Sequence, residues 1–215
     1  MGISIQEAKG IIAEVKARDA SIGRDMSRWC MYENHIVTAA NIARIIASKI
    51  KGMDEEQAYV NALLHDVCRT NERKEARFHG ISGYEYLIDK DKNAARSALL
   101  HMFLFNKLPA YEKCSQMFFG NKKDYDFIAN YIKNTQTTDN DLLVQLADNL
   151  SNKDGFVTIE QRAKDLEERR GITLDKDWLG ARNALKTYFD KKVGCNIYNL
   201  FTKLPMCIDR NGVCR

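Results

Sequence analysis

The sequence predicts an all-helical protein, a helical bundle forming one domain with helical extensions at both ends. Apolar residues recur with the period of a helix along most of the chain, and no alternating run is long enough to indicate a strand. The 215-residue chain contains only two prolines, which would break a helix from within. Its composition, 45% hydrophobic and 29% charged, is that of an ordinary globular protein and excludes a disordered or collagen-like class.

The first two predicted helices carry continuous apolar stripes. Residues 4–19 form an amphipathic helix whose apolar face includes Ile5, Ala8, Ile11, Ile12 and Val15. Residues 31–50 form a mostly buried helix, with His35 at its start and on the same face as Ala39, Ile42, Ile46 and Ile50. Gly52 ends this second helix, since glycine commonly follows a helix C-terminus.

A third helix begins after Asp54, whose carboxylate can cap the free amide groups of the first turn. It runs through the sequence AYVNALLHDVCR and is followed by a break at residues 70–75. Further helices are expected at residues 80–90, 92–103, 123–135, 139–151, 158–170 and 177–192. Residues 106–121 are the least regular segment and are expected to form a loop over the site. The last helix packs on the bundle through Trp178, Leu185, Tyr188 and Phe189.

Charge and targeting signals narrow the class of protein further. The formal net charge is +4, with acidic and basic residues intermixed, so the sequence gives little indication of binding to duplex nucleic acid. No segment reaches the roughly 20 apolar residues of a membrane span, and the charged N-terminus lacks the apolar core of a signal peptide. We therefore expect a cytoplasmic protein without a membrane partner. The six cysteines lack CxxC spacing and are expected to be free, buried thiols.

The chain contains four histidines, and each lies within or beside a predicted helix. His65 and Asp66 form a doublet at the end of a buried helix, and His35 precedes them by thirty residues. His79 follows in RFHGISGYEYL, and His101 follows in ARSALLHMF. Asp148 lies inside the apolar run LLVQLADNL, where a carboxylate is costly to bury unless it meets a cation or hydrogen-bond donors. Imidazole and carboxylate ligands together suit iron, manganese, cobalt or zinc. A single histidine on an apolar helix face is more often an ordinary core residue than a metal ligand. The prediction of a metal site therefore depends on all of these residues occurring together in this order.

This order of residues, H…HD…D on helices, resembles the HD superfamily of metal-dependent phosphohydrolases. The similarity covers residues 25–170 and includes HIVTAANIA, AYVNALLHD and ADNLSNKDGF. It implies an HD-domain core at residues 25–170, an N-terminal helix at residues 1–24 and a helical C-terminal extension at residues 171–215. The four defining positions are occupied by His35, His65, Asp66 and Asp148.

Two additional histidines, His79 and His101, make the chain similar to the subgroup with a second metal, which includes bacterial diadenosine tetraphosphatases. In that subgroup Asp66 would bridge the two ions, and iron is the expected metal. One site would then contain His35, His65 and Asp148, and the other would contain His79 and His101. Whether one or two ions bind is left open by the sequence.

Departures from better-known branches limit what can be said of the substrate. No GYP signature of cyclic-di-GMP phosphodiesterases occurs, and Arg69 stands where HDxxE members have glutamate. Arg69 instead takes the place of the lysine in the common HDxGK pattern and could clamp a phosphate, although an arginine at a helix end is also favoured by the helix dipole. Arg73 and Lys153 are weaker candidates for substrate binding, and Lys153 could equally be an ordinary surface lysine.

The resemblance implies hydrolysis of a phosphate ester or anhydride, with a small phosphorylated compound of nucleotide type as the expected substrate. Bound metal would act as a Lewis acid and activate water, while Asp66 and Arg69 would orient the nucleophile and stabilise negative charge. A di-iron oxygenase similar to myo-inositol oxygenase uses the same ligand types and remains an alternative. A metal-stabilised binding module without catalysis is a third. A homodimer is left open by the sequence.

Overall fold

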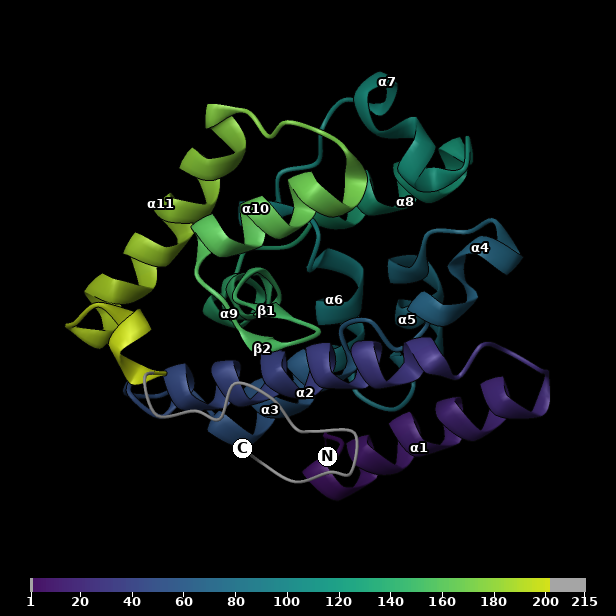
Figure 1. The fold of residues 1–215 in the computed structure, drawn as a ribbon, viewed down its shortest axis with the longest axis horizontal. Helices are drawn as coiled ribbons and strands as arrows, with labels where there is room; N and C mark the ends of the chain where they lie inside the picture. The colour runs from purple at the N-terminus through teal and green to yellow at the C-terminus, as the bar shows by residue number, and fades with distance from the viewer. Residues whose placement is uncertain (1, 202–215) are drawn as a thin grey trace.

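Helix α9 (Asp139–Asn149) lies at the centre of the bundle and is seen end-on in Figure 1. It contacts four other helices, α2 (Ser27–Ala47), α3 (Glu55–Leu64), α6 (Lys92–Leu100) and α11 (Lys176–Val193). The residues from Asp141 to Ala147 are all buried, as expected for a helix that is enclosed on every side. A carboxylate near the end of this helix therefore lies close to the middle of the protein.

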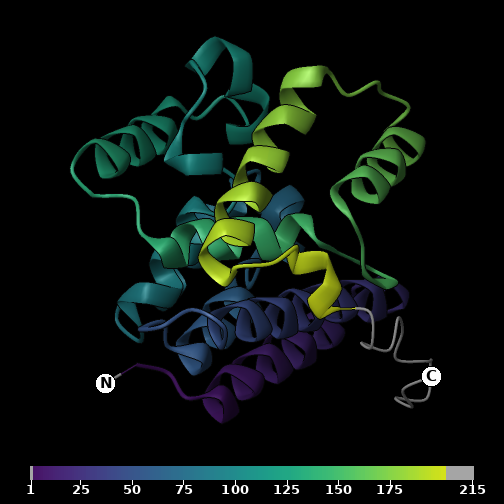
Figure 2. The same ribbon diagram turned by 90° about the vertical axis from the view of Figure 1, so that its left-hand side faces the viewer.

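The computed structural model describes residues 2–201, apart from the side chains of Arg28, Asn71 and Arg73. It confirms the prediction of a mostly helical protein. The remaining helices are α1 (Ile5–Ser21), α4 (Glu72–Glu75), α5 (His79–Leu87), α7 (Tyr111–Cys114), α8 (Lys122–Lys133) and α10 (Ile159–Arg170). Short 3₁₀ turns lie between them, namely η1 (Arg69–Asn71), η2 (Leu104–Asn106), η3 (Ser115–Phe118) and η4 (Ile197–Leu200). In both Figure 1 and Figure 2, α10 and α11 lie on the opposite side of α9 from α1.

Side-chain caps explain where several of these helices begin. Asp54 caps α3 by accepting hydrogen bonds from the first-turn amides, as the sequence predicted. Thr138 caps α9 and Thr158 caps α10, each in a reciprocal pair with an acidic or amide side chain three residues later. At the other ends, Gly171 and Gly194 adopt the left-handed conformation that stops α10 and α11.

The structure corrects four details of the sequence prediction. Helix α2 begins at Ser27 rather than at residue 31, so His35 lies two turns inside it. Helix α3 ends at Leu64, which leaves the His65–Asp66 doublet in a turn instead of on the helix. A small antiparallel hairpin, β1 (Ser151–Asn152) and β2 (Gly155–Phe156), follows α9, and its two-residue strands are too short to show an alternating pattern. Residues 106–121 contain α7 and η3 and pack on a core cluster through Phe118.

The apolar core has two parts. The larger joins α1, α2, α3, α6, α9 and α11, and the smaller gathers around Phe78, Phe103 and Phe118. Between them, α5 and α6 approach closely at Gly80 and Gly83. A Cβ atom added at Gly80 would lie 2.5 Å from the Phe78 ring and 3.0 Å from the carbonyl oxygen of Ala98. Only glycine therefore permits this approach of the two helices.

An ion pair between the partly buried Arg96 and the buried Asp141 ties α6 to α9. Arg96 donates two hydrogen bonds to the carboxylate of Asp141, at 2.6 and 2.7 Å, and the Asn106 side chain donates a third at 3.2 Å. The Asp141 carboxylate also accepts from the backbone amide of Thr138 at the start of α9. These contacts fix the position of α9 along α6.

The cysteines within the described residues are all free thiols, and they differ in burial. Cys68 and Cys114 are buried free thiols as predicted, whereas Cys30 and Cys195 are free but exposed, which corrects the expectation of burial for those two. Cys207 and Cys214 belong to the expected C-terminal extension and lie outside the described residues. Among the helices of residues 2–201, none is both long and apolar enough to cross a membrane.

Candidate metal centre

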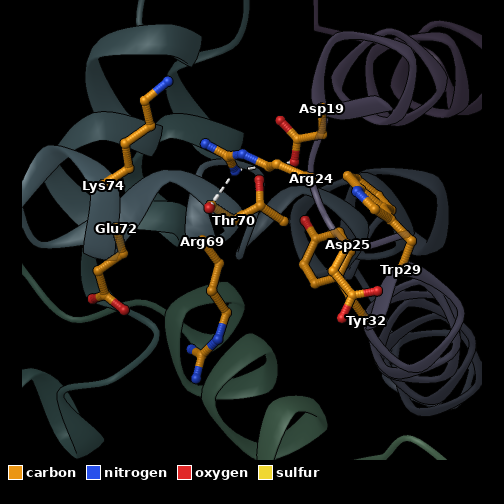
Figure 3. A pocket seen from close by; sticks show the side chains of 9 residues that line it. All are labelled: Asp19, Arg24, Asp25, Trp29, Tyr32, Arg69, Thr70, Glu72 and Lys74. Carbon is orange, nitrogen blue, oxygen red and sulfur yellow. Dashed lines mark hydrogen bonds and ion pairs between the residues drawn. The ribbon is translucent and has the colours of Figure 1, made fainter. Parts of the chain in front are cut away.

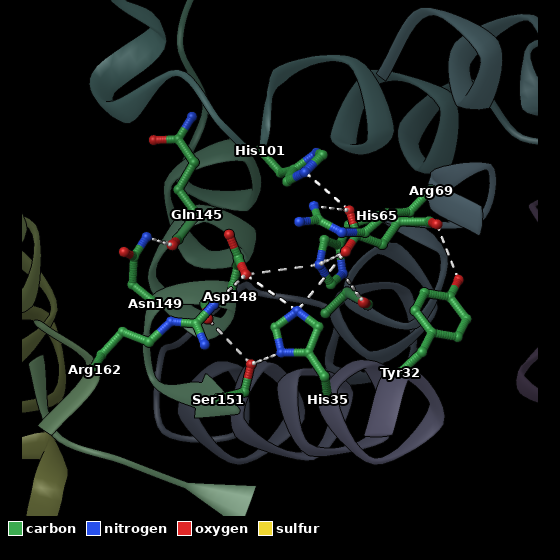
Figure 4. A network of polar contacts seen from close by, with 12 residues as sticks. Tyr32, His35, His65, Arg69, His101, Gln145, Asp148, Asn149, Ser151 and Arg162 are labelled. Atoms are coloured by element: carbon green, nitrogen blue, oxygen red, sulfur yellow. Dashed lines mark hydrogen bonds and ion pairs between the residues drawn. The ribbon is translucent and has the colours of Figure 1, made fainter. Parts of the chain in front are cut away.

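The four histidines converge on one point from four different elements. His35 comes from within α2, His65 from the residue after α3, His79 from the first residue of α5 and His101 from the residue after α6. Asp66 lies among them in the turn after α3. Asp148, labelled beside His35 and His65 in Figure 4, reaches the same point from the last turn of α9. The structure thus brings together all six residues that the sequence singled out as metal ligands.

Asp66 is the shared member of the cluster, because its two carboxylate oxygens face different histidines. Its Oδ1 atom lies 3.0 Å from Nε2 of His79 and 3.2 Å from Nε2 of His101. Its Oδ2 atom lies 3.7 Å from Nε2 of His65 and 3.9 Å from Nε2 of His35. Two groups of donor atoms close enough to hold a metal ion result, one with His35 and His65 and the other with His79 and His101.

Asp148 adds a second carboxylate to the first of these groups. Its Oδ1 atom lies 3.2 Å from Nε2 of His35 and 3.9 Å from Nε2 of His65. The side chain of Asp148 is 21% exposed and that of His35 is 14% exposed, whereas Asp66 and the other three histidines are at most 2% exposed. The group with Asp148 is therefore the one that opens towards solvent.

Each histidine is oriented by a contact on its outer nitrogen, so that Nε2 faces the centre. Nδ1 of His65 lies 2.6 Å from the carbonyl oxygen of Ala62, and Nδ1 of His101 lies 2.9 Å from that of Ala98. In the same way, Nδ1 of His79 lies 2.7 Å from Oε1 of Glu72, and Nδ1 of His35 lies 3.0 Å from Oγ of Ser151. Ser151 donates its own proton to the carbonyl oxygen of Asp148, so it can accept one from His35 (Figure 4).

This arrangement fits a metal. Ligand histidines typically donate their other ring N–H to a carboxylate or a carbonyl, as His65, His79 and His101 are placed to do. The Nε2 atom of His65 is buried and has no hydrogen-bond partner among the described residues, which is costly unless a cation takes that place. Nitrogen and oxygen donors together match divalent transition metals.

The electrostatics of the cluster favour the metal-binding forms of His35, His65, Asp66 and Asp148, whereas His79 is drawn towards its protonated form. Burial lowers the pKa of His35 and His65, so both are neutral near neutral pH. Burial alone would raise the pKa of Asp66, but the charge of Arg69 and the surrounding histidines hold that pKa well below its usual value. The pKa of Asp148 is lowered in the same way, against its burial, mainly by its contact with His35. For His79, contacts with Asp66 and Glu72 outweigh burial and raise the pKa.

Arg69 lies at the rim of the cluster. Its guanidinium Nη1 is 3.4 Å from Oδ1 of Asp66, and the side chain is 42% exposed. Tyr32 stabilises the turn that contains Asp66, because its hydroxyl donates a hydrogen bond of 2.9 Å to the backbone oxygen of Asp66. Beside this rim lies an open cavity of about 630 Å³, lined by residues that include Arg69, Glu72 and Tyr32. Figure 3 shows Arg69 extending away from the contact between Arg24 and Thr70 on the cavity wall.

Lys153 and Arg73 are the other two residues that the sequence predicted to bind substrate. Lys153 lies in the hairpin turn, where its Nζ pairs with Asp154 at 2.6 Å. The side chain of Arg73 lies outside the described residues. Arg77, four residues further along the chain, binds Glu85 through two hydrogen bonds and Asp124 through a third.

Several side chains at the site were not found from the sequence. Glu72 and Ser151 orient ligands, and Arg162 of α10 lies 3.8 Å from Oδ1 of Asp148. Glu72 falls in a segment that carries no helical pattern, and Ser151 lies in the two-residue strand β1, three residues after Asp148. Arg162 lies in a polar helix that also contains Arg169 and Arg170, so no local signal singled it out.

Comparison with known proteins agrees with this geometry. The family model described as HD domain matches residues 32–153, more than half of the chain. The match includes all six residues of the cluster and ends before α10 and α11. No curated protein matches the chain, and no solved structure matches it.

Proposed function

The chain belongs to the HD domain family, and from that premise we propose that it is a metal-dependent hydrolase of a phosphate ester or anhydride. Members of this family are mostly metal-dependent phosphohydrolases. We further propose that the substrate is a small phosphorylated compound of nucleotide type. The observation that carries the proposal is the position of Asp66, with one carboxylate oxygen facing His35 and His65 and the other facing His79 and His101.

The residues that would hold metal follow from this division. His35, His65 and Asp148 would hold one ion, His79 and His101 would hold a second, and Asp66 would contact both. Iron, manganese, cobalt and zinc suit these donors, and iron is the metal we favour for a dinuclear site. A divalent ion in such a site supplies Lewis acidity towards a phosphoryl oxygen and makes water a stronger acid.

The side chains around the cluster have separate tasks in this reaction. Asp66 is ionised and buried, so it can orient the water that attacks phosphorus. Arg69 carries a full positive charge beside Asp66, and its fork of N–H donors suits the phosphoryl oxygens on which negative charge develops. Substrate would approach past His35 and Asp148, the two partly exposed members of the cluster.

The outer partners contribute by preorganisation. Glu72, Ser151 and the carbonyl oxygens of Ala62 and Ala98 fix the ring orientation of the histidines, so the ligands do not have to reorganise when metal or substrate binds. The buried members of the cluster exclude bulk water, which strengthens the charge interactions among them.

The test combines metal content with hydrolysis. Elemental analysis of protein purified without chelator or histidine tag is expected to give about two transition-metal ions per chain, falling towards one in His79→Ala and His101→Ala. The same preparations are screened against nucleoside mono-, di- and polyphosphates and phosphodiesters by phosphate release. Asp66→Asn is expected to abolish hydrolysis, whereas Asp126→Asn, on the exposed face of α8, is the matched control and retains it.

Two outcomes would redirect the proposal. Oxygen consumption with a mixed-valent di-iron EPR signal, in place of phosphate release, would identify an oxygenase. Negligible metal content in a fully helical protein would identify a binding module without metal chemistry.

A further inference from the structure

Helix α10 lies outside the residues that match the HD domain, yet one of its arginines reaches the metal centre. The Nη2 atom of Arg162 lies 3.8 Å from Oδ1 of Asp148, and Figure 4 shows the guanidinium directed at that carboxylate. The same Oδ1 atom lies 3.2 Å from Nε2 of His35. Arg162 therefore approaches the carboxylate oxygen that faces the His35 group of metal ligands.

The Arg162 side chain is mostly enclosed but forms no close polar contact. It is only 16% exposed, whereas a charged arginine usually stays at the surface. Its second neighbour is Asp165, whose Oδ2 atom lies 3.8 Å from Nη1 of Arg162. Both separations allow an ion pair but are too long for a hydrogen bond. The five N–H donors of this guanidinium are thus held in a confined place without an acceptor at bonding distance among the described residues.

Asp165 is bound more closely by another arginine of the same helix. Arg169 donates from Nε to one oxygen of Asp165 at 2.9 Å and from Nη2 to the other at 2.7 Å. Two parallel hydrogen bonds of this kind are the arrangement in which a guanidinium and a carboxylate bind best. Asp148 is therefore the main countercharge left to Arg162 within the described residues.

Arg162 would lose this countercharge whenever Asp148 holds a metal ion. The carboxylate would then be neutralised by the ion, and the guanidinium would lie a few ångströms from a second positive charge. Like charges so close together in a partly buried site repel strongly. An anion that contacts both of them removes the repulsion. A phosphoryl group is such an anion, because its oxygens can bind a metal and also accept hydrogen bonds from a guanidinium.

The position of Arg162 also suits the side from which substrate would enter. Asp148 and His35 are the partly exposed members of the cluster, and Arg162 lies beside them. Arg69 approaches the cluster from elsewhere, with its Nη1 atom 3.4 Å from Oδ1 of Asp66. Figure 4 shows Arg69 and Arg162 on opposite sides of the cluster. A phosphoryl group bound at the opening would therefore have a guanidinium on each side.

We propose that Arg162 is a catalytic residue, which donates hydrogen bonds to a non-bridging oxygen of the phosphoryl group under attack, opposite Arg69. The inference rests on the proposed phosphohydrolase function, and it makes the first helix after the HD match part of the active site. Arg162 keeps its proton throughout, so it contributes charge and hydrogen bonds to the oxygens on which negative charge is spread. In the competing role, Arg162 would only position Asp148 for the metal.

The test measures phosphate binding and metal content on the same preparations, so that it does not depend on turnover. Inorganic phosphate is titrated by calorimetry into protein that has been loaded with transition metal and freed of excess ion. Arg162→Gln is expected to weaken phosphate binding by about tenfold, a ratio equivalent to about 1.4 kcal/mol, with the metal content of the parent. Arg162→Lys keeps the charge but loses the fork of donors, so its Kd should lie between the two.

The kinetic counterpart uses any phosphate compound that the parent protein hydrolyses. Arg162→Gln should lower kcat more than it raises KM, because a catalytic contact is stronger in the transition state than in the bound substrate. Lys164→Gln is the matched control, since it removes a positive charge from the same helix at a side chain that is 78% exposed. This variant should leave phosphate affinity, kcat and KM unchanged.

Several results would overturn the assignment. A parent-like Kd for phosphate in metal-loaded Arg162→Gln would do so, whether or not that variant binds metal more weakly, and lost metal with unchanged phosphate affinity would identify the positioning role. Circular dichroism checks the fold of each variant. If Arg162→Gln does not fold, Arg162→Lys decides the question, because it retains a charge for Asp148 and Asp165. A parent-like Kd for phosphate in Arg162→Lys would then refute the contact.

The same measurements distinguish failure of this inference from failure of the proposed function. Phosphate binding that depends on Arg162, in a protein that hydrolyses no phosphate compound, would retain the phosphate contact and refute the hydrolase. Hydrolysis by Arg162→Gln with the kcat and KM of the parent would retain the hydrolase and refute the role of Arg162.

Discussion

The Nδ1 atom of His79 lies 2.7 Å from Oε1 of Glu72, while Nδ1 of His35 lies 3.0 Å from Oγ of Ser151. The contact with Glu72 orients a histidine of the group that contains His79 and His101, and the contact with Ser151 orients one of the group that contains His35 and His65. The two groups can therefore be weakened separately, without changing any residue that faces the metal.

Substitution of Glu72 should affect one ion and spare the other. Glu72→Ala is expected to weaken the ion at His79 and His101 by about 10- to 100-fold, because the imidazole loses the acceptor that fixes it. Ser151→Ala should instead weaken the ion at His35 and His65. Metal titrations followed by elemental analysis would check both. Loss of both ions in Glu72→Ala would contradict two separable sites.

Removal of metal should lower the melting temperature. A ligand at about 100 times its Kd stabilises the folded chain by about 2.7 kcal/mol, and each kcal/mol corresponds to about 2–4 °C for a chain of this size. Chelation is therefore expected to lower Tm by roughly 5–10 °C, with recovery on return of the metal. Differential scanning fluorimetry measures this. An unchanged Tm, with metal loss verified, would mean that the ion adds no stability.

Gly80→Ala should disturb the packing that positions two of the histidines. The added methyl group would meet the Phe78 ring and the Ala98 carbonyl oxygen, and that oxygen holds Nδ1 of His101. We expect a loss of about 1–3 kcal/mol in the free energy of unfolding, together with weaker binding of the ion at His79 and His101. Urea unfolding and metal analysis report the two effects.

Gly180→Ala is the matched control for that substitution. Gly180 lies within α11, and an added Cβ atom would meet nothing within 4 Å. This variant should gain about 0.5–1 kcal/mol, since alanine favours the helix, and should bind metal normally. Equal destabilisation of both variants would mean that the approach of α5 to α6 is not the cause.

Asp141→Ala should destabilise the fold without touching the metal ligands. The substitution leaves Arg96 without the carboxylate that accepts two of its hydrogen bonds at the α6–α9 contact. Breaking a buried pair in this way costs about 3–5 kcal/mol. Chemical denaturation measures the loss, and metal content under native conditions serves as the control. A change below about 1 kcal/mol would mean that the pair behaves like a surface ion pair.

The cysteines should differ in their reactivity towards an alkylating reagent. Burial raises the pKa of Cys68 to about 11, so at about pH 8 it is a protonated, shielded thiol. Cys114 is also buried and its pKa is also raised by burial, whereas Cys30 and Cys195 are exposed. Peptide mass spectrometry after brief iodoacetamide treatment of the native protein should find modification at Cys30 and Cys195 before Cys68 and Cys114. Rapid labelling of Cys68 would indicate that the turn after Asp66 opens readily.

Much of the fold and of the cluster was predictable because the relevant signals are local. Apolar periodicity and the Asp54 cap indicate helices directly, and the ordered histidines and aspartates indicate one site. The end of α3 at Leu64 was missed because the apolar pattern continues past the residue where the backbone turns. The hairpin at Ser151 was missed because two residues cannot show a period.

The roles of Glu72 and Arg162 could not be derived from sequence for a different reason. Their contacts depend on how separate helices pack back onto the centre. Surface arginines and glutamates are common, and nothing in their immediate sequence separates these from the rest. Long-range geometry, rather than local propensity, selects them.

Three helices end at the cluster. His65 follows the last residue of α3, His101 follows the last residue of α6, and Asp148 lies in the final turn of α9. The C-terminus of a helix carries a partial negative charge of about half an electron from its aligned peptide dipoles. Helix α5 begins here instead, and Glu72 lies at its N-terminus. The backbone itself therefore attracts cations to this point before any side chain binds them, and a variant that lacks one ligand should still recover metal when the ion is supplied in excess.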